Sequence, residues 1–153
     1  MYDLSYLFYY KNLIILYLVI MSEIESIIDD LLDEEEIIFG VAIINKEGSI
    51  VSQTSNWDLN SDLSLINEIL AQNLKLGEKG ISTITLQGIK YMIVENTEER
   101  KIGTNITGKG HIIICPIPVG GTGALILYIS PNAGPRDALF TAQEYALKLT
   151  NFM

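Results

Sequence analysis

The stretch that decides the fold is Lys101–Pro116, which reads KIGTNITGKGHIIICP. Two apolar, β-branched runs, at residues 101–107 and 111–116, flank the short segment Gly108-Lys109-Gly110. Such runs separated by a glycine-containing turn are typical of a β-hairpin, because glycine adopts the backbone angles that a tight turn requires. The stretch therefore predicts two neighbouring antiparallel strands.

The same stretch nearly matches a phosphate-binding motif. Residues 103–109 fit the pattern G-x-x-x-x-G-K-[ST] up to its last position, where Gly110 replaces the hydroxyl that would bind Mg²⁺. A phosphate-binding loop also opens a helix, whereas the residues that follow here are β-branched and end at Pro116. We interpret the segment as a turn between strands and expect no cofactor.

The rest of the chain predicts an α+β fold. We expect a first helix that begins at Ser22 with a capping box, a middle helix capped by Ser61 or Asp62, and a last helix that contains Tyr145 and has Pro135 in its first turn. The strands are expected at residues 37–44, 49–54, 81–86, 89–95, 101–107, 111–116 and 124–129. Short connections require antiparallel neighbours, so the sequence predicts an antiparallel sheet of six to seven strands flanked by N- and C-terminal helices.

Composition limits the classes of function. The 153 residues are enough for one domain, and a net charge of −9 disfavours nucleic acid and anionic lipid as partners. Cys115 is the single cysteine and His111 the single histidine, which argues against a disulfide framework and against a Cys/His metal site. No nucleophile with a neighbouring base is visible, so we expect a protein that is not an enzyme.

Residues 1–21 are rich in Tyr and Leu, unlike the acidic segment that follows them. They lack the basic start and the small-residue cleavage site of a secretory signal. Lys11 and Asn12 leave only residues 13–21 as an apolar run, which is short for a membrane span. We expect a flexible or partly helical extension that lies against the apolar surface of a domain at residues 22–153. The alternatives are a weak membrane association and a biological start at Met21.

Several stretches resemble the profilin family of actin-monomer-binding proteins. GVAIINKEGSIVSQTS (residues 40–55) is similar to the family's first hairpin, LQGIKYMIV (residues 86–94) to its Gly-Gly-x-Lys-Tyr-Met-Val-Ile hairpin, and GKGHIII (residues 108–114) to its glycine-rich turn. The resemblance covers residues 22–153. It implies a monomeric, cytoplasmic, cytoskeleton-associated protein that regulates actin polymerisation.

The resemblance also implies an actin-binding surface on one side of the sheet and the start of the last helix. Phe140 falls where many members place an aromatic residue, which would make it an anchor; an ordinary core residue is the alternative. Carboxylates at two positions that are basic in animal profilins imply weak or no phosphoinositide binding and an actin with a differently charged surface. The implied residues are Ile93, Glu95, Thr104, Lys109, His111, Arg136, Asp137, Phe140 and Thr141.

Profilins also bind proline-rich peptides, in a groove of stacked aromatic rings between the terminal helices. Here most of the matching positions are aliphatic, while the N-terminal extension is rich in tyrosine. We therefore hypothesise that the extension adds rings to this groove or covers it as a removable lid. The residues concerned are Ile24, Ile27, Val51, Tyr145, Phe152, Tyr6, Tyr9 and Tyr10.

A second family remains open at this point. FGVAIINKEGSIV (residues 39–51) also resembles roadblock and longin-type modules, which dimerise and bind small GTPases. Those modules have fewer strands, so the additional hairpin at Lys101–Pro116 favours profilin. A monomer in solution would favour profilin as well, since the alternative modules pair through a helix or an edge strand.

Overall fold

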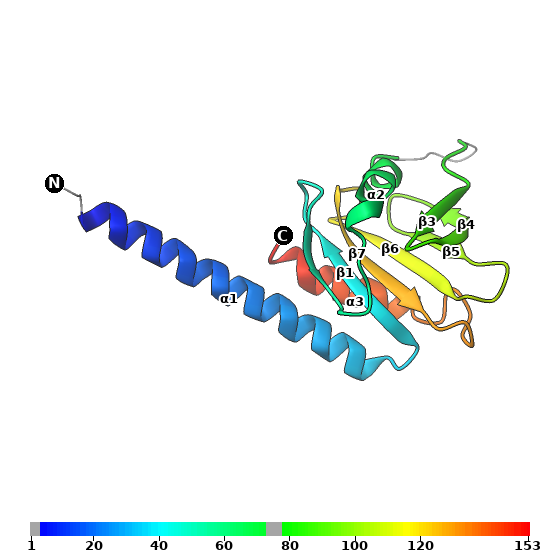
Figure 1. Ribbon diagram of the computed structural model, residues 1–153, viewed down its shortest axis with the longest axis horizontal. Helices are drawn as coiled ribbons and strands as arrows, with labels where there is room; N and C mark the ends of the chain where they lie inside the picture. Colours follow the sequence, from blue (N-terminus) through cyan, green and yellow to red (C-terminus); the bar gives the residue numbers. More distant parts are fainter. Residues whose placement is uncertain (1–3, 73–77) are drawn as a thin grey trace.

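The computed structural model of the protein describes residues 4–72 and 78–153. Seven strands form one antiparallel sheet in the order β2-β1-β7-β6-β5-β4-β3, with helices packed against it (Figure 1). This architecture confirms the predicted α+β class. The elements are α1 (Leu4–Glu34), β1 (Ile38–Ile44), β2 (Ile50–Gln53), a short 3₁₀ helix (Asn60–Asp62), α2 (Leu63–Leu70), β3 (Thr83–Leu86), β4 (Ile89–Asn96), β5 (Lys101–Thr104), β6 (His111–Ile117), β7 (Gly123–Ile129) and α3 (Leu139–Thr150).

The stretch that decides the fold forms β5 and β6, which pair as antiparallel neighbours as predicted. β5 ends at Thr104, earlier than expected, because Asn105 begins the turn: its side-chain oxygen accepts the N–H of Lys109 at 3.0 Å. Gly110 has a φ of +105°, and a Cβ there would lie 2.6 Å from the carbonyl oxygen of Ile129. Only glycine fits this position.

The sheet separates two apolar clusters, one on each face. Alternate residues of β1 divide between them, so that Val41 and Ile43 face α1 and α3 while Ala42 and Ile44 face α2. Every one of these four side chains is fully buried. The near-continuous apolar sequence of β1 is therefore explained by burial on both of its faces.

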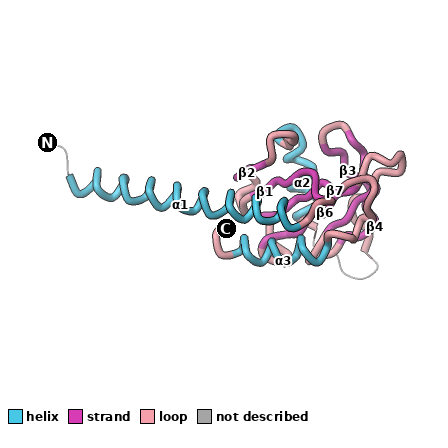
Figure 2. Tube along the Cα trace, turned by 90° about the horizontal axis from the view of Figure 1, so that it is seen from below, coloured by secondary structure: helices cyan, strands magenta, loops and turns pink. Residues whose placement is uncertain are grey.

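The first helix extends much further than predicted. It begins at Leu4 and runs without a break to Glu34, so the expected start at Ser22 is wrong. No glycine or proline interrupts this segment, and leucine is a strong helix former. The expectation that the extension lies against the domain is not met by residues 4–19, which are exposed and project away from it (Figure 2), whereas Ile20 and Met21 pack against the core.

Two other expected helix starts need correction. Asp62 does precede α2, but its carboxylate caps no helix N–H and instead accepts the backbone N–H of Gln87 at 2.9 Å. Pro135 lies before the last helix, which begins only at Leu139. Asp62 is engaged in a tertiary hydrogen bond, and Pro135 lies inside the turn that the Asp137 N–H closes on the carbonyl oxygen of Gly134 at 3.2 Å.

Candidate functional site

The helices on one face of the sheet leave its β4 end uncovered. Met92 and Val94 of β4 are 46% and 43% exposed. Thr104 of β5 is paired with Met92, and His111 of β6 is paired with Thr104, so these side chains share one face. We call the surface they form, with the adjoining start of α3, the open face. It consists of Met92, Val94, Glu95, Thr104, His111, Arg136 and Phe140.

Ile93 does not belong to the open face, contrary to the expectation. Its side chain packs against the cluster on the opposite face of the sheet, with Tyr91 and Ile84. Successive residues of a strand point to opposite faces of the sheet. An assignment that is shifted by one residue therefore places a side chain on the wrong face. The exposed neighbours of Ile93, Met92 and Val94, are the residues that the sequence reasoning missed. The alternation of β4 could have indicated them.

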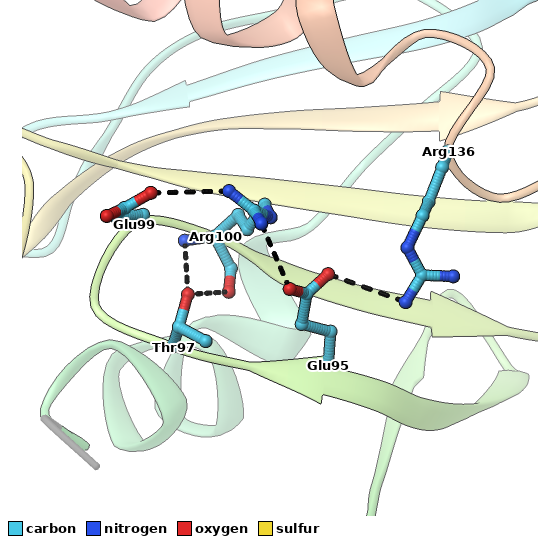
Figure 3. A network of polar contacts seen from close by, with 5 residues as sticks. All are labelled: Glu95, Thr97, Glu99, Arg100 and Arg136. Atoms are coloured by element: carbon cyan, nitrogen blue, oxygen red, sulfur yellow. Dashed lines mark hydrogen bonds and ion pairs between the residues drawn. The ribbon is translucent and has the colours of Figure 1, made fainter. Parts of the chain in front are cut away.

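A charged network joins β4 to the loop before α3 (Figure 3). The Glu95 carboxylate lies 3.2 Å from Nη2 of Arg100 and 3.5 Å from Nη2 of Arg136, and Arg100 also pairs with Glu99 at 3.3 Å. Glu95 is therefore flanked by two guanidinium groups, which offset its charge. The sequence comparison led us to expect a negative charge here in place of a basic residue. The two guanidinium groups lower the net negative charge of this part of the surface.

His111 is held at both ring nitrogens. Nε2 lies 2.7 Å from the carbonyl oxygen of Ala133, and Nδ1 lies 2.7 Å from the hydroxyl of Thr104. A carbonyl can only accept, so Nε2 carries a proton and, in the neutral ring, Nδ1 accepts the Thr104 hydroxyl. His111 thus ties β5 and β6 to the loop before α3, and fixes the surface on which Thr104 and Arg136 lie.

The start of α3 divides its predicted residues between surface and interior. Phe140 is 81% exposed, which excludes the alternative of an ordinary core residue. Thr141 is 9% exposed and donates a hydrogen bond of 3.3 Å to Glu35 Oε2, so it faces α1 instead. Asp137 is exposed, but its carboxylate accepts the N–H of Gly134 at 2.7 Å and closes the turn before the helix. Of the predicted residues at the start of α3, Phe140 is the one whose aromatic side chain is open to solvent.

Lys109 lies in the turn between β5 and β6, with an exposed side chain. Its carbonyl oxygen accepts the hydroxyl of Tyr128 at 2.6 Å, which anchors the turn to β7. A hollow of about 370 Å³ between this turn and β4 is lined in part by Lys90, Met92, Ile106 and Lys109. Lys109 is thereby adjacent to the open face through Met92.

The residues assigned to a peptide groove lie in two separate places. Ile24 is 1% exposed and Tyr145 is 3% exposed, and the Tyr145 hydroxyl donates to Glu34 Oε2 at 2.5 Å. Their neighbours Ile27, Val51 and Phe152 are partly buried in the same cluster. The tyrosines at 6, 9 and 10 are on the projecting part of α1, where all three are exposed (Figure 1). The structure therefore does not bring these rings to the cluster around Tyr145.

Reactive groups are scarce in the described ranges. Burial raises the pKa of the Cys115 thiol to about 12, so the thiol stays protonated and inert. Within residues 4–72 and 78–153, no group of three or more His, Cys, Asp or Glu residues could hold a metal ion. The open face offers apolar contacts, hydrogen bonds and paired charges, which are the components of a recognition surface.

Together, the helix-flanked antiparallel sheet and its open face define a small binding module. The chain is 66% identical to Loki profilin-1 and to Loki profilin-2 of Lokiarchaeum sp. (strain GC14_75), over 134 residues that cover 87% of this chain and 100% of each relative. It is 31% identical to Odin profilin of Odinarchaeota yellowstonii over 73% of this chain and 85% of that one. No family model matches the chain. The chain belongs to the profilin family.

Solved structures agree with this assignment. The LokiProfilin2/rabbit actin complex contains a chain that matches with a TM-score of 0.82 at 66% identity, over 86% of this chain and 98% of that one. The crystal structure of the LokiProfilin1/rabbit actin complex matches with the same TM-score at 64% identity, over 86% and 97%. The roadblock and longin alternative is set aside, because the described part of the chain forms seven strands and the Lys101–Pro116 hairpin belongs to the sheet.

Proposed function

We propose that this protein binds monomeric actin through its open face and thereby regulates actin polymerisation. The observation that carries the proposal is the 81% exposure of Phe140 beside the open face of a chain that belongs to the profilin family. Met92 and Val94 are also exposed, and apolar surface gathered on one face, with polar residues around it, marks an interaction site. The proposal places the protein in the cytoplasm, in association with the cytoskeleton.

The open face has the composition of a protein interface. Phe140 supplies an aromatic anchor and Met92 and Val94 supply apolar area, while Glu95 and Arg136 form a charged rim. Aromatic residues, methionine and arginine are enriched at interfaces, and a few anchors carry most of the binding free energy. An actin monomer bound to the open face could not use its covered surface to contact other actin monomers. Nucleation, which requires such contacts, is the step that the protein would suppress.

Proline-rich peptides are a weaker part of the proposal. The side chains of Ile24 and Tyr145 are buried, and the Tyr145 hydroxyl is already bonded to Glu34. A peptide would have to displace these contacts before it could stack on the ring. We therefore expect weak peptide binding at this position, visible as small chemical-shift changes on titration with polyproline.

The test is a pair of phenylalanine substitutions with opposite expected results. Phe140→Ala should weaken actin binding by about 30-fold, the factor for the loss of a hot-spot residue of about 2 kcal/mol. Phe39→Ala is the matched control: Phe39 is 49% exposed and its ring lies 6.4 Å from that of Tyr128, which packs on the other side of the sheet. The control should leave actin affinity within about twofold.

The measurements are pyrene-actin polymerisation, in which the wild type should delay spontaneous nucleation, and calorimetric titration of actin monomers. Thermal unfolding of both variants shows whether they are folded. If the wild-type protein neither delays nucleation nor binds monomers, the proposal is wrong. If both variants lose affinity equally, the open face is not the binding surface.

A further inference from the structure

The most unusual surface of the molecule is the projecting part of α1, residues 4–19. Each of these residues is exposed, including the large side chains of Ile14, Leu16 and Leu18 at 58%, 55% and 58%. Both views show this segment extending beyond the domain without a neighbouring element (Figure 1, Figure 2). A soluble domain rarely exposes so large an apolar surface unless something covers it.

The distribution of apolar residues around the helix shows what kind of partner fits. Residues 13–19 are LIILYLV, seven consecutive apolar or aromatic side chains, each 42% to 61% exposed. Consecutive residues are about 100° apart around a helix, so these seven leave no polar side. A groove or a second helix would cover only one stripe. A helix that is apolar all round fits a lipid environment instead.

The length and ends of the segment agree with a bilayer. Residues 4–19 rise about 24 Å at 1.5 Å per residue, which is most of the hydrocarbon thickness of about 30 Å. Among the described residues, α1 is the helix that is long and apolar enough to cross a membrane, judged by length and composition. Tyr6, Tyr9 and Tyr10 lie near its outer end, where tyrosine is enriched at membrane interfaces.

We propose that residues 4–19 of α1 insert into the hydrocarbon layer of a lipid bilayer and tether the folded domain to a membrane. The helix continues unbroken into the core, where Ile24, Ile28 and Leu31 are buried, so the apolar segment and the domain share one rigid element. The predicted short apolar run of residues 13–21 is thus extended by the helical residues that precede it.

Lys11 is the single charged residue in residues 4–21. It lies about 10 Å along the helix from Leu4, at 1.5 Å per residue, so its flexible stem can carry the ammonium toward the lipid headgroups. The exposed side of α1 next to the domain is acidic, with Glu23, Glu25 and Asp29. Repulsion between these carboxylates and anionic lipid headgroups therefore opposes the insertion, and the apolar surface must drive it.

The tether leaves the open face free. In Figure 1 the projecting half of α1 leaves the domain on the side away from β3, β4 and β5. A membrane at the outer part of α1 would present β4 and its surroundings toward the solvent. The tether is independent of actin binding, so either proposal can fail without the other.

The test is flotation of the full-length protein with vesicles of neutral phosphatidylcholine, and with vesicles that also contain phosphatidylserine. The protein should float with neutral vesicles at least as well as with anionic ones, at low and high salt alike. Leu16→Arg should lower the partition coefficient by about 10- to 100-fold, because leucine and arginine differ by at least about 100-fold at the centre of a membrane helix and by less toward its ends. Ile106→Arg, at a turn residue that is 78% exposed, is the matched control and should not change partition.

Lys11→Leu gives a result of opposite sign. Removal of the charge should raise partition if the helix enters hydrocarbon, and lower it if the lysine only contacts headgroups. Absence of flotation, flotation with anionic vesicles alone, or equal flotation of the wild type and Leu16→Arg would overturn the proposal. So would a defined oligomer in sedimentation that Leu16→Arg dissociates while vesicles bind neither form, because the occupant would then be a second copy of this chain.

Discussion

The two halves of α1 have the same backbone structure and opposite surroundings. Ile24, Ile28 and Leu31 in the C-terminal half are 1%, 6% and 1% exposed, whereas Leu16 in the N-terminal half is 55% exposed. The C-terminal half repeats its apolar residues at helical spacing with acidic residues between them, and the N-terminal half does not. Packing against one face of a sheet requires that spacing, and lipid does not.

The comparison also separates two sources of helix stability. The C-terminal half is held by burial against the sheet and α3, while the N-terminal half depends on backbone hydrogen bonds and on being continuous with a folded turn. A helix already nucleated by a domain extends at little cost when its residues are good helix formers. Substitutions in the two halves should therefore differ strongly in their effects.

The largest effect is expected in the buried half. Leu31→Ala removes a side chain that is 1% exposed and leaves a cavity, so it should lower the free energy of unfolding by about 3 kcal/mol. Urea denaturation followed by far-ultraviolet circular dichroism measures this. A loss below about 1 kcal/mol would mean that α1 is not packed as described.

A smaller effect is expected where α1 meets α3. Tyr145→Phe deletes the hydroxyl that donates to Glu34 and should cost about 1 kcal/mol at neutral pH. The hydrogen bond to Glu34, together with burial, raises the pKa of Tyr145 well above its ordinary value.

The sign of the pH dependence follows from that shift. A tyrosine with a raised pKa in the folded state contributes stability below its ordinary pKa of about 10, and this contribution is lost as pH rises above that value. The stability difference between the wild type and Tyr145→Phe should therefore shrink from pH 9 to pH 11, about one unit on either side of the ordinary pKa. A difference that grows over this range would contradict the hydrogen bond.

The smallest effect is expected in the projecting half. Leu16→Ala should change the free energy of unfolding in aqueous solution by no more than about 0.5 kcal/mol, since the side chain has no packing to lose. The same denaturation experiment serves for both halves. A loss comparable to that of Leu31→Ala would show that residues 4–19 are packed in solution, and would remove the contrast between the halves.

The candidate site was only partly predictable. The resemblance assigned Phe140, Arg136 and His111 to one surface, and the structure puts them around the open face; their role in actin binding stays a prediction. Ile93 and Glu95 were assigned to one face, as strict alternation along a strand requires. The bulge between them breaks this alternation, and Ile93 packs on the other face of the sheet. Thr141 was assigned to the binding surface, yet its side chain is buried and donates a hydrogen bond to Glu35.

The sequence alone determined the elements that depend on local chemistry. The hairpin at Lys101–Pro116 follows from two β-branched runs and the glycines between them, and the strand count and class follow from similar short runs. Local pattern suffices there because a turn and its strands are specified by residues close together in the chain.

Tertiary structure decided what each side chain meets. Whether Phe140 is an anchor or a core residue, whether Ser22 begins a helix and which residues surround Glu95 all depend on segments distant in the sequence. Arg136 reaches Glu95 across 41 positions, and no local pattern encodes that contact. Burial and charge pairing are properties of the assembled molecule, so only the folded chain fixes them.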